Sequence, residues 1–114
     1  MTLDTEYISQ QVKDALAIED WSTVKCVYIS GSFANPEKDI DKDGNTSDID
    51  IEIVTPDVQA FEDAQKSICY DGRNPATLHV TGNQEDYGKR EMDFIHRIDV
   101  DSSVSKVFLP IGES

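Results

Sequence analysis

The sequence predicts an α+β fold, a mixed β-sheet of about four to five strands flanked by helices. Two stretches have apolar residues at helical spacing, and several short apolar or alternating runs are typical of strands. Their order along the chain is helix, strand, strand, helix and then strands. The length of 114 residues is close to the usual size of one domain, so residues 1–114 are expected to form a single one.

Two helices follow from apolar spacing and from a helix-start signal. The first is predicted over residues 3–18, with its apolar residues at Ile8, Val12, Ala15 and Leu16. The second is predicted to start at Thr55-Pro56, with Thr55 as N-cap and Pro56 at the first helical position. Its apolar stripe consists of Val58, Phe61, Ala64 and Ile68.

Strands are predicted wherever short apolar or alternating runs lie between polar segments. The predicted strands are residues 24–30, 48–54, 76–81 and 89–98, with a short last strand at 106–111. Residues 36–47 are predicted to form a polar loop, and residues 82–88 a polar connection.

The charge balance excludes one broad class of function. The chain has 23 acidic and 10 basic residues and a net charge of −13. Such a surface repels phosphate backbones, and broad nucleic-acid binding requires a basic footprint. A small nucleotide bound together with metal remains compatible with this charge.

Cysteine usage and hydropathy indicate a cytoplasmic protein. Cys26 and Cys69 have no spacing motif, so both are expected to be reduced. No charged-then-apolar leader and no apolar run of about 18 residues occurs, so neither secretion by that route nor membrane insertion is expected.

The run from Ser47 to Ile53 is the most informative part of the chain. In a strand, side chains alternate between faces, so Asp48, Asp50 and Glu52 share one face and isoleucines occupy the other. Carboxylates two residues apart lie about 6.6 Å from one another. At an effective dielectric near 20 they repel by about 2–3 kcal/mol. A divalent metal usually offsets such charges, and oxygen ligands favour Mg²⁺, Mn²⁺ or Ca²⁺.

Gly31-Ser32 after an apolar strand, followed by Asp48-Ile49-Asp50 on the next, resembles the nucleotidyltransferase fold of the polymerase-beta superfamily, in its minimal form. The resemblance covers roughly residues 24–98. It implies metal-dependent transfer of a nucleoside monophosphate from an NTP such as ATP to a hydroxyl, with two metal ions. The chain departs from the family in one respect: 15 residues separate Ser32 from Asp48. The resemblance implies about nine to thirteen, so the polar loop is interpreted as containing an insertion.

The resemblance also implies the site residues. Asp48, Asp50 and a third carboxylate on a later strand would be catalytic and would bind Mg²⁺ or Mn²⁺. Asp93, between Met92 and Phe94, matches the third position best, with a solvent-facing strand residue as the alternative. Gly31 and Ser32 would bind the nucleotide, although this pair could also be a simple strand-ending turn. The triphosphate contact is left open among Lys38, Lys42, Arg73, Lys89 and Arg90.

The resemblance extends to partners. Minimal nucleotidyltransferases often act with a helical protein of the HEPN type. A partner of this kind, or a second copy in a homodimer, would supply the missing wall of the cleft. The acceptor hydroxyl would belong to a protein or a small molecule, because the acidic surface makes nucleic acid an unfavourable substrate.

An alternative is a catalytically inactive nucleotidyltransferase fold or a calcium-binding interaction domain that uses residues 39–50. This segment has the register of an EF-hand loop, with acids at positions one, three and five, and Gly44 at six. Asp50 falls at position twelve, where Glu is usual, and Thr46 replaces the usual aliphatic residue at eight. The two hypotheses compete for Asp50, and a solvated acidic turn would also fit the segment.

His79 and His96 lie on two predicted strands and could be neighbours. No third ligand with zinc spacing accompanies them, so they are interpreted as ordinary strand histidines.

Overall fold

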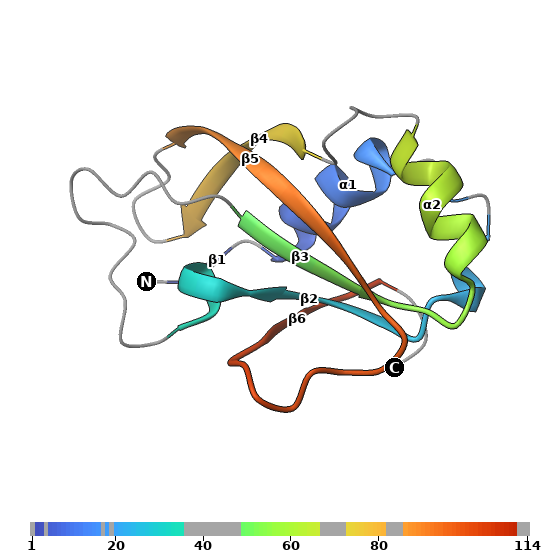
Figure 1. The fold of residues 1–114 in the computed structure, drawn as a ribbon. Helices are drawn as coiled ribbons and strands as arrows, with labels where there is room; N and C mark the ends of the chain where they lie inside the picture. The colour runs from blue at the N-terminus through green and yellow to red at the C-terminus, as the bar shows by residue number, and fades with distance from the viewer. Residues whose placement is uncertain are drawn as a thin grey trace.

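The computed structural model describes residues 2–3, 5–16, 18, 20–35, 49–66, 73–81 and 86–111. It has an α+β architecture, as the order of helical and strand-like segments predicts (Figure 1). The elements, in chain order, are β1 (Thr2–Leu3), α1 (Thr5–Ala15), the 3-10 helix η1 (Trp21–Thr23), β2 (Cys26–Ser30), the 3-10 helix η2 (Gly31–Ala34), β3 (Ile49–Val54), α2 (Val58–Lys66), β4 (Arg73–Thr81), β5 (Asp86–Arg97) and β6 (Val107–Leu109).

The strands form one mixed sheet in the order β1-β4-β5-β3-β2-β6. Strands β3 and β5 are parallel, and the other neighbouring pairs are antiparallel. Six strands occur in the described residues, one more than the upper end of the prediction. The additional strand is β1, whose two residues are too few to show an alternating pattern.

One face of the sheet, here called the helix face, carries the hydrophobic core. The alternation predicted for β3 is confirmed, since its three isoleucines point into this core and are at most 1% exposed. Helix α1 covers them with Ile8 and Val12, and α2 contributes Phe61. Figure 1 shows α1 behind β3 and β5. Full burial of such a side chain contributes about 1.5–3 kcal/mol, so the core fixes which face of β3 points outward.

The second helix begins later than predicted. Its first residue is Val58, and its N-cap is Asp57, whose Oδ1 accepts a hydrogen bond from Ala60 N at 3.1 Å. The N–H of Thr55 is bonded to the carbonyl of Arg97 on β5 at 2.9 Å, so Thr55 still belongs to the sheet. The Thr55 hydroxyl instead accepts from Asp57 N. With this later start Val58 is 40% exposed, so it is not part of the buried stripe.

Strands β4 and β5 are longer than predicted, and α1 is shorter. Strand β5 includes Asp86–Gly88, which the local polarity assigned to a connection, because this segment pairs with β4. Helix α1 spans Thr5–Ala15 rather than residues 3–18, because Leu3 pairs with Val80 in the sheet. No helix in the described ranges is long and apolar enough to cross a membrane.

Candidate functional site

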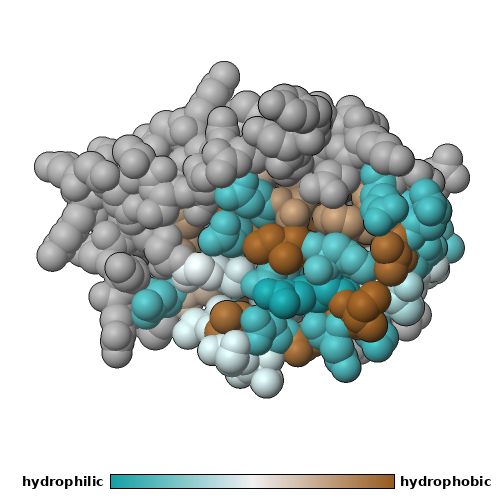
Figure 2. All heavy atoms as spheres, viewed as in Figure 1, coloured by the Kyte–Doolittle hydropathy of each residue, from teal (hydrophilic) through white to brown (hydrophobic). Residues whose placement is uncertain are grey.

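The face of the sheet opposite the helices, here called the polar face, carries ionisable and hydroxyl side chains on three adjacent strands. Its members are Tyr28 and Ser30 on β2, Asp50 and Glu52 on β3, and Asp93 and Arg97 on β5. They share a face because each strand alternates and the register pairs Tyr28 with Glu52 and Ser30 with Asp50. The described surface seen in Figure 2 is largely hydrophilic, with hydrophobic side chains interspersed.

Asp50 and Asp93 are brought together by the parallel pairing of β3 and β5. They are register partners, so their side chains leave the same face of neighbouring strands. Neighbouring strands lie about 4.8 Å apart. Both residues are partly buried. Two of the three predicted carboxylates therefore extend from neighbouring positions on one face of the sheet.

Gly31 lies directly beside Asp50. It opens the η2 turn with φ of 70°, a left-handed conformation that favours glycine. A Cβ built on Gly31 would overlap the Asp50 Oδ2 atom. The carboxylate therefore occupies the space that a side chain at residue 31 would need. Ser32 follows in the same turn, and its side chain lies outside what the structure describes.

The third predicted carboxylate, Asp48, lies outside the described residues, as does the rest of the 39–48 segment of the calcium hypothesis. Among the described residues, no group of three or more His, Cys, Asp or Glu side chains has metal-binding geometry. The described donor set is thus the pair Asp50 and Asp93. Carboxylate oxygens suit Mg²⁺ or Mn²⁺ better than softer metals.

Of the basic residues considered for the triphosphate, Arg73 has its backbone opposite one member of the acidic pair. The antiparallel register of β4 and β5 makes it the partner of Asp93. Lys89 and Arg90 pair with Thr77 and Ala76, further along the same ladder. Lys38 and Lys42 lie outside the described residues.

Glu52 shares the face of Asp50, as the alternation predicts, but its charge is offset by a side chain rather than by a metal. It is 2% exposed, and it accepts hydrogen bonds from Tyr28 Oη at 2.9 Å and Arg97 Nε at 2.7 Å. The Ser30 side chain also bonds to it. Burial alone would raise the pKa of Glu52, but the bonds from Ser30, Arg97 and Tyr28 outweigh burial and lower it. No local pattern identifies Arg97 as the partner, because the two residues are 45 positions apart.

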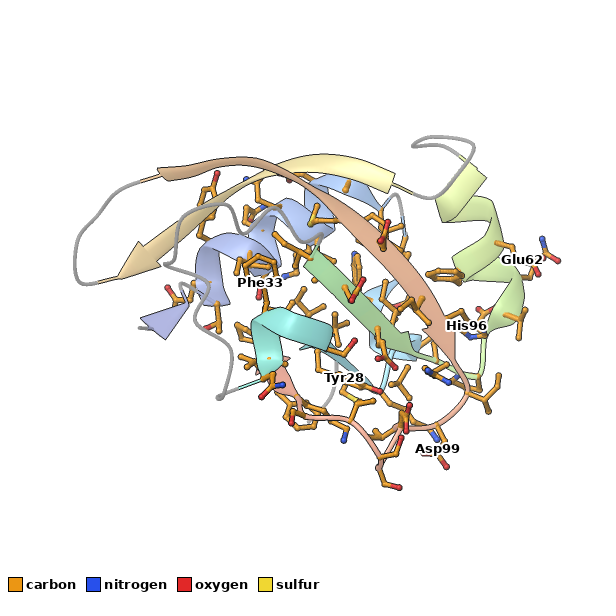
Figure 3. The ribbon with its side chains drawn as sticks, turned by 60° about the vertical axis from the view of Figure 1, so that its left-hand side comes forward. Tyr28, Phe33, Glu62, His96 and Asp99 are labelled. Carbon is orange, nitrogen blue, oxygen red and sulfur yellow. The ribbon has the colours of Figure 1, made fainter. Side chains whose placement is uncertain are left out.

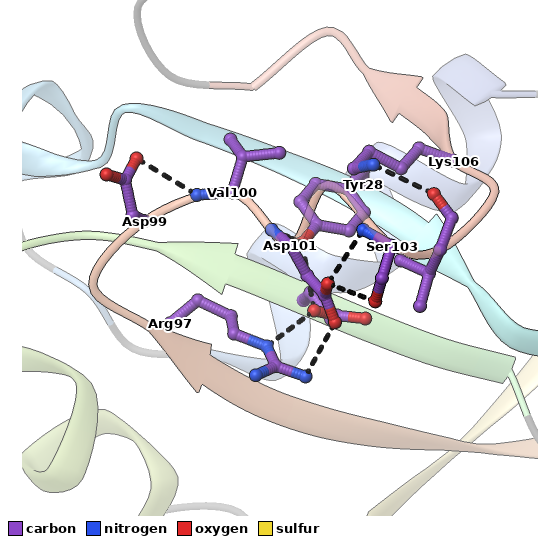
Figure 4. Close-up of polar contacts among 9 residues, drawn as sticks. Tyr28, Arg97, Asp99, Val100, Asp101, Ser103 and Lys106 are labelled. Atoms are coloured by element: carbon purple, nitrogen blue, oxygen red, sulfur yellow. Dashed lines mark hydrogen bonds and ion pairs between the residues drawn. The ribbon is translucent and has the colours of Figure 1, made fainter.

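The same network ties the segment after β5 to the polar face (Figure 4). Arg97 Nη2 lies 3.3 Å from Asp101 Oδ2, and Asp101 N donates to Tyr28 Oη at 3.1 Å. Asp101 is further fixed by Ser103, whose hydroxyl and N–H both donate to its Oδ1, and these bonds lower the pKa of Asp101. Tyr28 is fully buried beneath this segment.

The two histidines are not neighbours. His79 pairs with Asp86 at the start of β5, whereas His96 lies near the end of that strand. His96 faces α2 in Figure 3, where its ring stacks on Phe61 at 5.1 Å and its Nε2 lies 2.8 Å from the Thr55 carbonyl oxygen. This arrangement agrees with the interpretation of His96 as an ordinary strand histidine.

The cysteines add no chemistry to the polar face. Cys26 is a free thiol, and burial raises its pKa, which favours the unreactive protonated form. Cys69 lies outside the described residues.

Comparison with known proteins gives no relative, since no family model, no curated protein and no solved structure matches this chain.

Proposed function

We propose that this protein is a metal-dependent nucleotidyltransferase that transfers a nucleoside monophosphate from an NTP to a hydroxyl group. One observation supports this most strongly: Asp50 and Asp93 are register partners on one face, and the Asp50 carboxylate lies against the Gly31 turn. Gly31 and Asp50 belong to the Gly-Ser and Asp-x-Asp motifs of the sequence.

The acidic pair has the chemistry of a site for a hard divalent cation. At the spacing of neighbouring strands, two carboxylates repel by about 3 kcal/mol for an effective dielectric near 20. In this proposal Asp50 and Asp93, with Asp48, would hold Mg²⁺ or Mn²⁺. When bound, such ions neutralise phosphate charge and orient the attacking and leaving oxygens.

Gly31 would take part in binding the nucleotide. Because residue 31 has no Cβ, the turn holds the Asp50 carboxylate close to its backbone, beside the place where this proposal puts the phosphates. Ser32, the next residue of η2, would add a hydroxyl donor. Protein groups thus position the phosphates, and positioning is most of what this class of reaction requires of a protein.

The alternative calcium site depends on Asp50 as its last ligand. In the structure the Asp50 carboxylate lies against Gly31 and on the same face as Asp93. A carboxylate shared with Asp93 belongs to a site between β3 and β5, which supports the nucleotidyltransferase proposal.

The proposed acceptor is a hydroxyl of a protein or small molecule. The net charge of −13 disfavours a nucleic-acid acceptor. A helical partner of the HEPN type or a second copy of this chain would complete the cleft, since one small domain supplies few walls.

The test is transfer of label from ATP carrying ³²P at the α-phosphate, with MgCl₂ or MnCl₂ and candidate acceptors. We expect metal-dependent label on the acceptor, and its loss in Asp50→Asn and Asp93→Asn. Asp99→Asn removes the same charge from an exposed acid after β5 and should transfer as the wild type does. Label from γ-³²P-ATP instead of α-³²P-ATP would show phosphoryl transfer and contradict the proposal. Label that persists in both Asp variants would also contradict it.

A further inference from the structure

Glu52 is two residues from Asp50 on the same face of β3, but its carboxylate is shielded from solvent. It is the most buried charged side chain of the polar face, at 2% exposure. Its hydrogen bonds reach both neighbouring strands, with Ser30 and Tyr28 on β2 and Arg97 on β5. A carboxylate that bridges three strands fixes their relative positions more tightly than backbone pairing alone.

The hydrogen bond between Ser30 and Glu52 lies next to the candidate site. Ser30 is the last residue of β2, it is the register partner of Asp50, and Gly31 follows it directly. It is 4% exposed, so its hydroxyl needs a partner within the protein. By bonding to the Ser30 side chain, Glu52 fixes the end of β2, where the Gly31 turn meets the Asp50 carboxylate.

Arg97 offsets the repulsion between the carboxylates of Glu52 and Asp50, which lie on the same face of β3. Without a cation, the charge of Glu52 would repel Asp50 by about 2–3 kcal/mol at their spacing of about 6.6 Å. The guanidinium lies 2.7 Å from Glu52 Oε1 and also binds Asp101. Glu52 can therefore stay ionised and hydrogen-bonded beside the acidic pair without being a metal ligand.

We propose that Glu52 is a positioning residue, which sets the geometry of Asp50, Asp93 and Gly31 for a divalent cation through its hydrogen bond to Ser30, while Arg97 offsets its charge. This inference rests on the proposed function, because it assumes that Asp50 and Asp93 bind the cation. It differs from a purely structural role, in which Glu52 would only stabilise the fold.

Two double variants with the same net charge as the wild type separate these roles. Glu52→Leu/Arg97→Met removes both charges and every acceptor at residue 52. Glu52→Gln/Arg97→Met removes the same charges but keeps an oxygen that can accept from Ser30 and Tyr28. Both variants remove the two charges together and leave neither Glu52 nor Arg97 as an unpaired charge, and the Arg97 side chain is 41% exposed, so both are expected to fold. Ser30→Ala removes the single bond next to Gly31, and Ser9→Ala, at an equally buried serine of α1, is its matched control.

The measurement is binding of Mn²⁺, from MnCl₂ alone, with free ion quantified by electron paramagnetic resonance and folding checked by circular dichroism. We expect Glu52→Leu/Arg97→Met to weaken Mn²⁺ affinity by about tenfold or more, the usual effect of losing an outer-shell partner. Glu52→Gln/Arg97→Met and Ser9→Ala should stay close to the wild-type affinity, and Ser30→Ala should be weakened.

The outcomes distinguish this inference from the proposed function. If the wild type binds Mn²⁺ and a folded Glu52→Leu/Arg97→Met protein binds it equally well, Glu52 has only a structural role. If that variant does not fold, Ser30→Ala decides, and wild-type affinity there overturns the inference. If the wild type itself binds no Mn²⁺, the proposed function fails, and the positioning role fails with it.

Discussion

Asp50 and Asp93 are register partners on the parallel strands β3 and β5, so that two acids 43 positions apart in the chain extend from the same face. The core buries the isoleucines of β3, and it also buries Met92 and Phe94 of β5. Since strand side chains alternate, burial of these neighbours forces both carboxylates to the other face. The acidic pair is thus a consequence of how the core is packed.

The close approach of Gly31 to Asp50 predicts that Gly31→Ala impairs both folding and metal binding. A left-handed conformation costs about 1–2 kcal/mol for a residue with a Cβ. The added Cβ would also overlap Asp50 Oδ2, so the carboxylate must move. We expect a lower urea midpoint, and Mn²⁺ affinity reduced by more than the loss of folded protein explains.

Gly31→Asn separates backbone strain from overlap. Asparagine tolerates the left-handed region better than alanine, but its Cβ occupies the same position. Similar loss of Mn²⁺ affinity in both variants supports the overlap with Asp50. Near-normal affinity in either folded variant would contradict it.

The bonds to Glu52 predict that stability falls in acid. Burial raises its pKa, but the bonds from Ser30, Arg97 and Tyr28 outweigh burial, and the net pKa is lowered in the folded state. A group of this kind stabilises the fold fully above its unfolded pKa of about 4.3. The contribution is lost as the pH falls through the lower folded-state pKa. Urea unfolding of the wild type should therefore show a free energy that declines below about pH 4.3.

Glu52→Gln tests whether this carboxylate is responsible. The variant should be less stable at neutral pH, and its stability should decline less steeply in acid than that of the wild type. Glu62→Gln removes an exposed carboxylate of α2 and is expected to follow the wild type. Parallel pH curves for the wild type and Glu52→Gln would show that other groups control the acid transition.

The start of α2 predicts a capping effect at Asp57. Asp57→Ala removes the side-chain acceptor of Ala60 N and should cost about 1 kcal/mol of unfolding free energy. Glu62→Ala, on the exposed side of the same helix, is the control. Equal urea midpoints for both variants would mean that Asp57 does not act as the cap.

The sequence predicted those features that depend on local pattern. Alternation in β3 identified its buried and polar faces, and the apolar neighbours of Asp93 placed this acid opposite the core. The strand-ending turn at Gly31 was also visible, because a glycine closes an apolar run. Each of these follows from neighbours within a few positions.

Features that depend on register between distant strands could not be predicted. The pairing of Arg97 with Glu52 requires that β5 lie parallel to β3 in one specific alignment. The sequence predicts Thr55 as a helix N-cap, because its neighbours in the chain give no sign of its backbone hydrogen bond to Arg97. Strand β1 exists only through its pairing with the end of β4, since its own two residues carry no pattern.

The central claim is that Asp50 and Asp93 hold one divalent cation together, and Mn²⁺ titration of a double-mutant cycle tests it most directly. If both acids bind the same ion, Asp50→Asn and Asp93→Asn should each weaken Mn²⁺ binding by more than about tenfold. The double variant should then bind little worse than either single variant, because the first substitution already removes the site. Wild-type affinity in a folded single variant, or independent additive losses, would contradict the claim.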